Sequence, residues 1–261
     1  MTGTGGPPLF FVHGFACDAT DWTAQRDAFA ARTTVVVCDL PGHGRSPGTA
    51  AECTVEAYGA RVGQALVDLA LPPAILIGHS MGCRVVLETA RVRPNAVAGL
   101  VLIDGSRIGD GDPLAAAGAM ADELRGDGYR LFVRRFFDAM FVASSDPALA
   151  EAITERALQL PPSIGRALMT DLAAWDAGNA GSALAAVRVP LLAIQSTTMD
   201  STRKRVSLQP GGESPWLNLI RATVPTATIA ALPGAGHFPQ IEQADAVAAL
   251  IARFIWPERT S

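Results

Sequence analysis

The sequence predicts an α/β fold with a mostly parallel sheet flanked by helices. Six short apolar runs support this class, at residues 9–12, 34–38, 74–77, 100–103, 191–194 and 228–232. Continuous runs of this kind are typical of strands buried on both faces. Longer helix-like segments lie between or after them, at residues 55–69, 81–92 and 244–254. Strands that alternate with helices form βαβ units, so we expect a sheet of about six strands.

Turn residues mark where these elements end. Gly78 and Gly105 follow the third and fourth runs, and Pro41-Gly42 follows the second. The residue before a proline avoids the helical region. The helix over 81–92 should therefore end at the Arg93-Pro94 step.

One long stretch breaks the alternation of strands and helices. Residues 109–186 show no strand pattern and are rich in Ala, Leu, Phe and Arg, so we expect several helices inserted between two strands. Phe132, Phe136 and Met140 share one face of a helix there. This apolar stripe either packs the insertion against the sheet or lines an apolar pocket.

Composition and charge exclude several classes of protein. Of the 261 residues, 49% are hydrophobic and 18% are charged, which is too apolar for a disordered chain. A net charge of −4 argues against binding to nucleic acid. No apolar run reaches the ~18 residues of a membrane span. The first eight residues lack the basic region of a secretory signal.

The cysteines indicate neither a disulfide framework nor a metal site. None of the four forms a Cys-x-x-Cys pair or a cluster with zinc spacing, namely Cys17, Cys38, Cys53 and Cys83. Four thiols in a chain of this length favour a reduced, cytoplasmic protein. We expect no metal and no cofactor.

A Gly-x-Ser-x-Gly turn carries the chemistry. It reads Gly78-His79-Ser80-Met81-Gly82 and lies between an apolar run and a helix. A sharp strand-to-helix turn needs small neighbours, and it lifts the serine hydroxyl above the sheet. The Met81 N–H then lies at the positive end of the helix, where it can bind a developing oxyanion. We expect Ser80 to be a nucleophile; the alternative is an inert serine in a tight turn.

A serine hydroxyl needs a base, and the chain holds four histidines. His237 lies in a Gly-rich loop after the last strand, in the order Ser…acid…His that accompanies this turn. His79 neighbours the serine, so its side chain should point away from the hydroxyl. His13 and His43 follow the first two strands. We expect His237 to be the base and the other three to be structural.

Four motifs together resemble the α/β-hydrolase superfamily, in its small bacterial esterase-like branch with a helical cap. They are His13-Gly14-Phe15 and residues 39–46, 78–82 and 234–239. The resemblance implies that the Phe15 N–H is a second oxyanion donor beside Met81. It implies a core of residues 1–108 and 187–261 with a cap of residues 109–186. It also implies that the first two strands of the family sheet are missing, because only eight residues precede the first run.

The triad acid departs from the pattern that the resemblance implies. The family acid lies in a Gly-x-x-Asp turn after the strand here at 191–194. If Ser196 stands for that glycine, Met199 occupies the acid position and Asp200 follows one residue late. Some branches place the acid one strand earlier, and Asp104 directly follows that strand. We prefer Asp104 because the strand itself anchors it, with Asp200 as the alternative.

These residues predict a serine hydrolase that cleaves a small apolar ester through an acyl-enzyme. Ser80 attacks the carbonyl, His237 takes its proton, and Asp104 orients the imidazole. The Phe15 and Met81 amides bind the oxyanion. A carboxylate partner raises the pKa of a histidine above ~6.5, so activity should rise between about pH 6 and 8.

Two other functions use the same residues. The triad could hydrolyse another electrophile, such as a lactone, a thioester or a carbon–carbon bond. Alternatively, the protein is a ligand-binding receptor with slow hydrolysis. A haloalkane dehalogenase would need an aspartate nucleophile, and residue 80 is serine. Turnover of a p-nitrophenyl ester separates an enzyme from a receptor.

Residues 201–216 look like an insertion relative to the family. One interpretation is a solvated loop. In the other, the Arg203-Lys204-Arg205 cluster meets an anionic group of the substrate.

Overall fold

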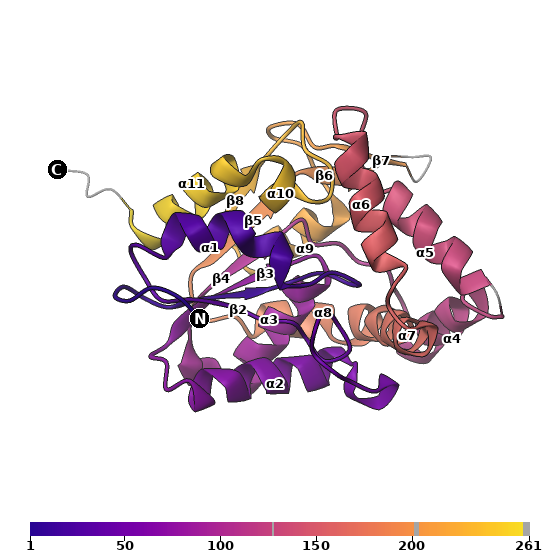
Figure 1. The fold of residues 1–261 in the computed structure, drawn as a ribbon, viewed down its shortest axis with the longest axis horizontal. Coiled ribbons are helices and arrows are strands. Elements are labelled where there is room, and N and C mark those ends of the chain that lie inside the picture. The colour runs from indigo at the N-terminus through magenta and orange to yellow at the C-terminus, as the bar shows by residue number, and fades with distance from the viewer. Residues whose placement is uncertain (127, 201–203, 258–261) are drawn as a thin grey trace.

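A computed structural model, which describes residues 1–126, 128–200 and 204–257, has a six-stranded sheet at its centre (Figure 1). Every pair of neighbours is parallel, in the order β2-β1-β3-β4-β5-β8. The strands are β1 (Leu9–Val12), β2 (Val35–Val37), β3 (Ala74–His79), β4 (Val97–Ile103), β5 (Leu191–Gln195) and β8 (Thr228–Ala231). The predicted parallel sheet of about six strands is confirmed.

Helices cover both faces of this sheet (Figure 1). One face is covered by α1 (Thr23–Phe29) and α11 (Ala244–Ile255). The other is covered by α2 (Val55–Asp68), α3 (Met81–Val92) and α9 (Pro215–Thr223). Short helical turns complete the connections: η1 (Ala19–Trp22), η2 (Ala50–Glu52), η3 (Pro94–Ala96) and α10 (Pro239–Glu242).

Alternate side chains of the strands divide between the two faces. Phe11 and Ile77 pack on the side of α1 and α11, whereas Phe10 and Leu76 pack on the side of α2 and α3. All four side chains are buried. Because both faces are covered, the strands appear in the sequence as unbroken apolar runs instead of alternating ones.

A helical insertion, residues 109–186, separates β4 from β5. Its described part contains helices and no strand. The helices are α4 (Pro113–Glu123), α5 (Gly128–Asp138), α6 (Pro147–Ala157), α7 (Pro162–Gly178) and α8 (Ala180–Ala185). Figure 1 shows α4, α5, α6 and α7 gathered to one side of the sheet. Because the insertion leaves the sheet after β4, it lies at the carboxyl ends of the strands.

A small hairpin follows β5 and forms a two-stranded sheet separate from the central one. Its strands, β6 (Thr197–Met199) and β7 (Arg205–Ser207), are antiparallel. One of the two interpretations of residues 201–216 was a solvated loop; their described part, 204–216, instead includes the strand β7 and the first two residues of α9. Arg203 lies outside the described residues. In the part of the chain that the structure covers, no helix is both long and apolar enough to cross a bilayer.

Candidate active site

Ser80 occupies the sharp turn between β3 and α3. Its backbone angles are φ = 52° and ψ = −114°, a conformation that residues other than glycine rarely adopt. A Cβ at Gly78 would lie 2.2 Å from the Gly82 carbonyl oxygen. A Cβ at Gly82 would lie 2.3 Å from the Val12 carbonyl oxygen. The two glycines of the motif are therefore required by close backbone contacts around the serine.

His237 lies between Ser80 and Asp104. Its Nε2 is 2.8 Å from the Ser80 Oγ, and its Nδ1 is 2.6 Å from the Asp104 Oδ2. Two hydrogen bonds hold the backbone of His237: its N–H donates to the Met140 carbonyl at 2.8 Å, and the His79 Nε2 donates to the His237 carbonyl at 2.6 Å. An Nδ1–H that faces the carboxylate leaves Nε2 as the acceptor for the serine proton.

Asp104 directly follows β4 and is fully buried. Its Oδ1 accepts the Ser196 N–H at 2.7 Å and the Thr197 N–H at 3.0 Å, and its Oδ2 accepts the Thr197 hydroxyl at 2.6 Å. Burial by itself would raise the pKa of Asp104. The hydrogen bond to His237 and the charge of its protonated ring, followed by the positive charge of Arg205 and the hydrogen bond from Thr197, outweigh burial and lower that pKa to about 2. The carboxylate is thus ionised at neutral pH.

Asp200, the alternative acid, lies at the turn of the β6–β7 hairpin. Its carboxylate accepts the Lys204 N–H at 3.0 Å, and its own N–H donates to the Lys204 carbonyl at 2.9 Å. The structure therefore brings Asp104, and not Asp200, into hydrogen-bond distance of His237.

The pKa of His237 lies below the usual histidine value, contrary to the expectation that Asp104 would raise it. Burial is the largest cause, because it penalises the charged imidazolium. The positive charge of Arg205 acts in the same direction. The hydrogen bond and charge of Asp104 raise the pKa but do not overcome these two effects.

The two residues predicted to supply the oxyanion donors, Phe15 and Met81, lie beside Ser80. The Met81 N–H is the first of α3 and so has no partner within the helix. A Cβ at Gly14 would lie 3.3 Å from the Ser80 Cβ, so the backbone that carries Phe15 passes close to the serine. Phe15 and Met81 both line a small cavity beside Ser80.

This cavity beside Ser80 has a volume of about 20 Å³. The helical insertion supplies part of its wall through Phe136, Met169 and Leu172. Met140, another residue of the apolar stripe, is buried in the core instead. It lies beyond the end of α5 at Asp138, so the helical stripe predicted from sequence does not extend to it. The two interpretations of the stripe thus apply to different residues: Phe136 lines the cavity and Met140 packs the insertion against the core.

A buried ion pair joins α3 to the helical insertion, and sequence reasoning missed it. The Arg84 guanidinium donates to both carboxylate oxygens of Asp176 in α7, at 2.7 and 2.6 Å. It also donates to the backbone carbonyls of Ser80 at 3.3 Å and Ser106 at 2.7 Å. Because the partners lie 92 positions apart, no local pattern in the sequence indicates the pair.

The remaining histidines make contacts with the backbone. His13 Nε2 accepts the Leu40 N–H at 3.0 Å, and His43 Nδ1 donates to the Pro41 carbonyl at 3.2 Å. Together with His79, both are buried. In the described part of the chain, no cluster of three or more His, Cys, Asp or Glu side chains is placed to hold a metal ion.

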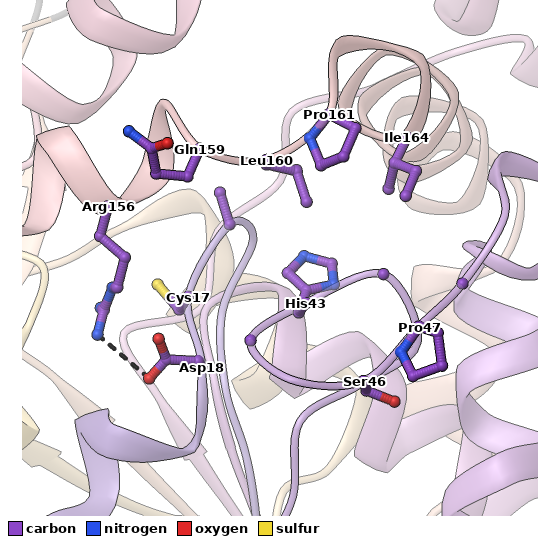
Figure 2. A pocket seen from close by; sticks show the side chains of 14 residues that line it. Cys17, Asp18, His43, Ser46, Pro47, Arg156, Gln159, Leu160, Pro161 and Ile164 are labelled. Carbon is purple, nitrogen blue, oxygen red and sulfur yellow. Dashed lines mark hydrogen bonds and ion pairs between the residues drawn. The ribbon is translucent and has the colours of Figure 1, made fainter.

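A second cavity, of about 510 Å³, lies between the core loops and the helical insertion (Figure 2). Figure 2 shows Asp18 paired with Arg156 on one side and His43 below Leu160. Burial raises the pKa of the Cys17 thiol in its wall well above the usual range, so this thiol is a poor nucleophile. Neither Ser80 nor His237 lines this cavity, so it is separate from the candidate triad.

Residues 9–250 match the alpha/beta hydrolase family, and the chain belongs to that family. The dihydrolipoyllysine-residue acetyltransferase component of the acetoin cleaving system of Cupriavidus necator is 26% identical over 260 residues. The match covers 97% of this chain and 64% of that protein. The pimeloyl-[acyl-carrier protein] methyl ester esterase of Methylococcus capsulatus is 36% identical over 101 residues, which are 39% of this chain and 38% of that protein. The chain thus spans less than two thirds of the length of these curated relatives.

Among solved structures, a thermophilic esterase from Thermogutta terrifontis has a TM-score of 0.78 and 27% identity. The superposition covers 97% of this chain and 90% of the esterase chain. The family and this neighbour identify the fold as that of an α/β hydrolase.

Proposed function

We propose that this protein is a serine hydrolase that cleaves carboxylic esters with small acyl groups. One observation carries the proposal: hydrogen bonds connect Ser80 Oγ, both ring nitrogens of His237 and the Asp104 carboxylate without interruption. The His237 tautomer that donates to Asp104 leaves Nε2 free to accept the serine proton.

The proposed reaction has two stages. Ser80 Oγ attacks the ester carbonyl carbon while its proton passes to His237 Nε2, and the N–H groups of Phe15 and Met81 bind the oxyanion. The carbon–oxygen bond to the alcohol then breaks, and the alcohol takes the proton from His237. Water repeats these steps on the acyl-enzyme, which releases the acid and regenerates Ser80.

The small cavity beside Ser80 supports the preference for small acyl groups. Its volume is about 20 Å³, and a water molecule needs roughly 10–15 Å³ on this measure. The cavity thus has room for a group about the size of a methyl. We propose that residues 109–186 act as a cap and that Phe136 sets the far wall. An acetyl group then fits in this cavity, whereas a long acyl chain would collide with the Phe136 ring.

The relatives support ester hydrolysis at the level of reaction class. The Methylococcus relative is named for hydrolysis of a methyl ester, and the Thermogutta neighbour is a thermophilic esterase. In both cases the likeness supports an ester substrate without identifying which ester.

The first test is turnover of p-nitrophenyl acetate by the full chain. We expect multiple turnovers, and Ser80→Ala should lower kcat by a factor on the order of 10⁶ where chemistry limits the rate. A folded Ser80→Ala variant with more than a few per cent of the activity would contradict the nucleophile. Stoichiometric binding without turnover would instead identify a ligand-binding protein.

The second test is a series of p-nitrophenyl esters from acetate to octanoate. We expect kcat/KM to fall as the acyl chain lengthens. Phe136→Ala should reduce this decline by enlarging the cavity. Phe132 stacks on Phe136, with ring centroids 5.4 Å apart, but does not line the cavity, so Phe132→Ala is the matched control. Equal gains for long esters in both variants would contradict the role of Phe136.

A further inference from the structure

Arg205 approaches the acid from the β6–β7 hairpin. Its Nη1 donates to the Thr197 hydroxyl at 2.6 Å and lies 3.6 Å from the Asp104 Oδ2. The same hydroxyl donates to that Oδ2 at 2.6 Å. Hydrogen bonds therefore run without a gap from Arg205 through Thr197, Asp104 and His237 to Ser80.

The Arg205 side chain is only 11% exposed, although the residue belongs to a surface hairpin. Burying a guanidinium is costly unless it is paired and hydrogen-bonded. The partners here are the Thr197 hydroxyl and the Asp104 carboxylate. One of the two interpretations from sequence was that the basic cluster containing Arg205 meets an anionic group of the substrate. The structure instead pairs Arg205 with Asp104, so its positive charge lies beside the acid of the candidate triad.

Several other polar or charged groups surround His237. Arg84 in α3 is the second cation, but its charge is paired with Asp176 in α7. His79 in β3 lies beside the ring, and burial lowers its pKa to about 3, so it is neutral. Glu242 in α10 accepts the N–H groups of Gly236 and Phe238 and the Ser145 hydroxyl. Arg205 is therefore the cation that directly offsets the Asp104 charge.

We propose that Arg205 is a positioning residue that holds the Asp104 carboxylate and extends activity to lower pH by opposing the charging of His237. This proposal rests on the proposed function, because it concerns the base of that reaction. The sign follows from the charges. A cation beside the pair disfavours imidazolium, so His237 stays neutral, and competent as a base, at a lower pH.

The test uses Arg205→Gln, Arg205→Lys and the control Lys204→Gln. Lys204 is exposed on the same hairpin, so its substitution removes one positive charge without touching Thr197 or Asp104. We expect the inflection of kcat/KM against pH for p-nitrophenyl acetate to move up by about one pH unit in Arg205→Gln. Arg205→Lys keeps the positive charge and should return the inflection most of the way to its wild-type pH, and Lys204→Gln should leave the profile unchanged.

A titration of the His237 imidazole by NMR, in the wild type and the same variants, gives a second readout without substrate. An upward shift of its pKa in Arg205→Gln supports the proposal even if no ester is turned over, in which case the proposed function fails alone. Three results would overturn the proposal: an unchanged imidazole pKa, equal shifts in Arg205→Gln and Lys204→Gln, or a loss of kcat at every pH without a shift.

Discussion

The carboxylate of Asp104 accepts hydrogen bonds from Ser196, Thr197 and His237, whereas that of Asp200 accepts one from Lys204, so substitutions at the two aspartates should have different effects. Asp104→Asn should lower kcat by roughly 10²–10⁴, because an amide facing Nδ1 favours the wrong imidazole tautomer. Asp200→Asn should cost less than about tenfold, since Asp200 closes the hairpin turn through Lys204. Steady-state rates and thermal midpoints of both variants check this. If Asp200→Asn lost its activity while Asp104→Asn kept its kcat, Asp200 would be the acid of the triad.

Residues of the candidate site could be predicted from sequence where they belong to a local pattern. Ser80 lies within a five-residue motif, and Asp104 directly follows an apolar strand. Neighbours in the sequence therefore indicated Ser80 and made Asp104 the preferred one of two candidate acids. The structure brings both to His237. The low pKa of His237 could not be predicted, because it depends on burial and on Arg205, which reaches the acid from a separate hairpin.

At the scale of elements, the Arg84–Asp176 pair connects α3 with α7. Asp176→Asn would leave the Arg84 guanidinium buried without its counter-charge, which costs about 3–5 kcal/mol. The matched control is Glu155→Gln, another carboxylate-to-amide change in the insertion. The Glu155 side chain is 51% exposed where it pairs with Arg134, so this change should cost under about 1 kcal/mol. Urea unfolding measures both, and equal costs would contradict the structural role of the buried pair.

The strands were predictable because burial on both faces leaves a continuous apolar run, as in β3 and β4. The β6–β7 hairpin was not predictable, because each strand has only three residues and only Met199 and Val206 among them are apolar. Its stability comes from backbone pairing and from the contact with Asp104, and neither leaves a periodic signal in the sequence.

For the whole molecule, we expect the four buried histidines to lower the free energy of unfolding at acidic pH. Burial lowers the pKa of His13 to about 4, of His43 and His79 to about 3, and also lowers that of His237. In the unfolded chain these groups titrate near ~6.5. The unfolded state therefore binds more protons between about pH 6.5 and 4, so stability present above that window is lost as pH falls through it.

Two carboxyls act in the opposite direction. Burial raises the pKa of the half-buried Asp171 to about 6 and also raises that of the buried Asp21, so protonation of these groups as pH falls below about 6 favours the folded state. Four histidines outweigh these two groups, and we expect Tm to fall by roughly 10 °C between pH 7.5 and 5. Scanning calorimetry across this range checks the expectation. A Tm that stays level or rises toward pH 5 would contradict it.

The left-handed backbone at Ser80 also has a consequence for evolution and engineering. A non-glycine residue in such a conformation costs about 1–3 kcal/mol, so the proposed nucleophile weakens the fold that carries it. Replacing Ser80 with glycine should therefore yield a more stable protein than replacing it with alanine, and we expect both variants to be inactive. At Ser182, in helix α8, the alanine variant should instead be more stable than the glycine variant, by about 1 kcal/mol in the free energy of unfolding. Selection for thermal stability alone would thus favour loss of the serine, and only selection for activity keeps it in place.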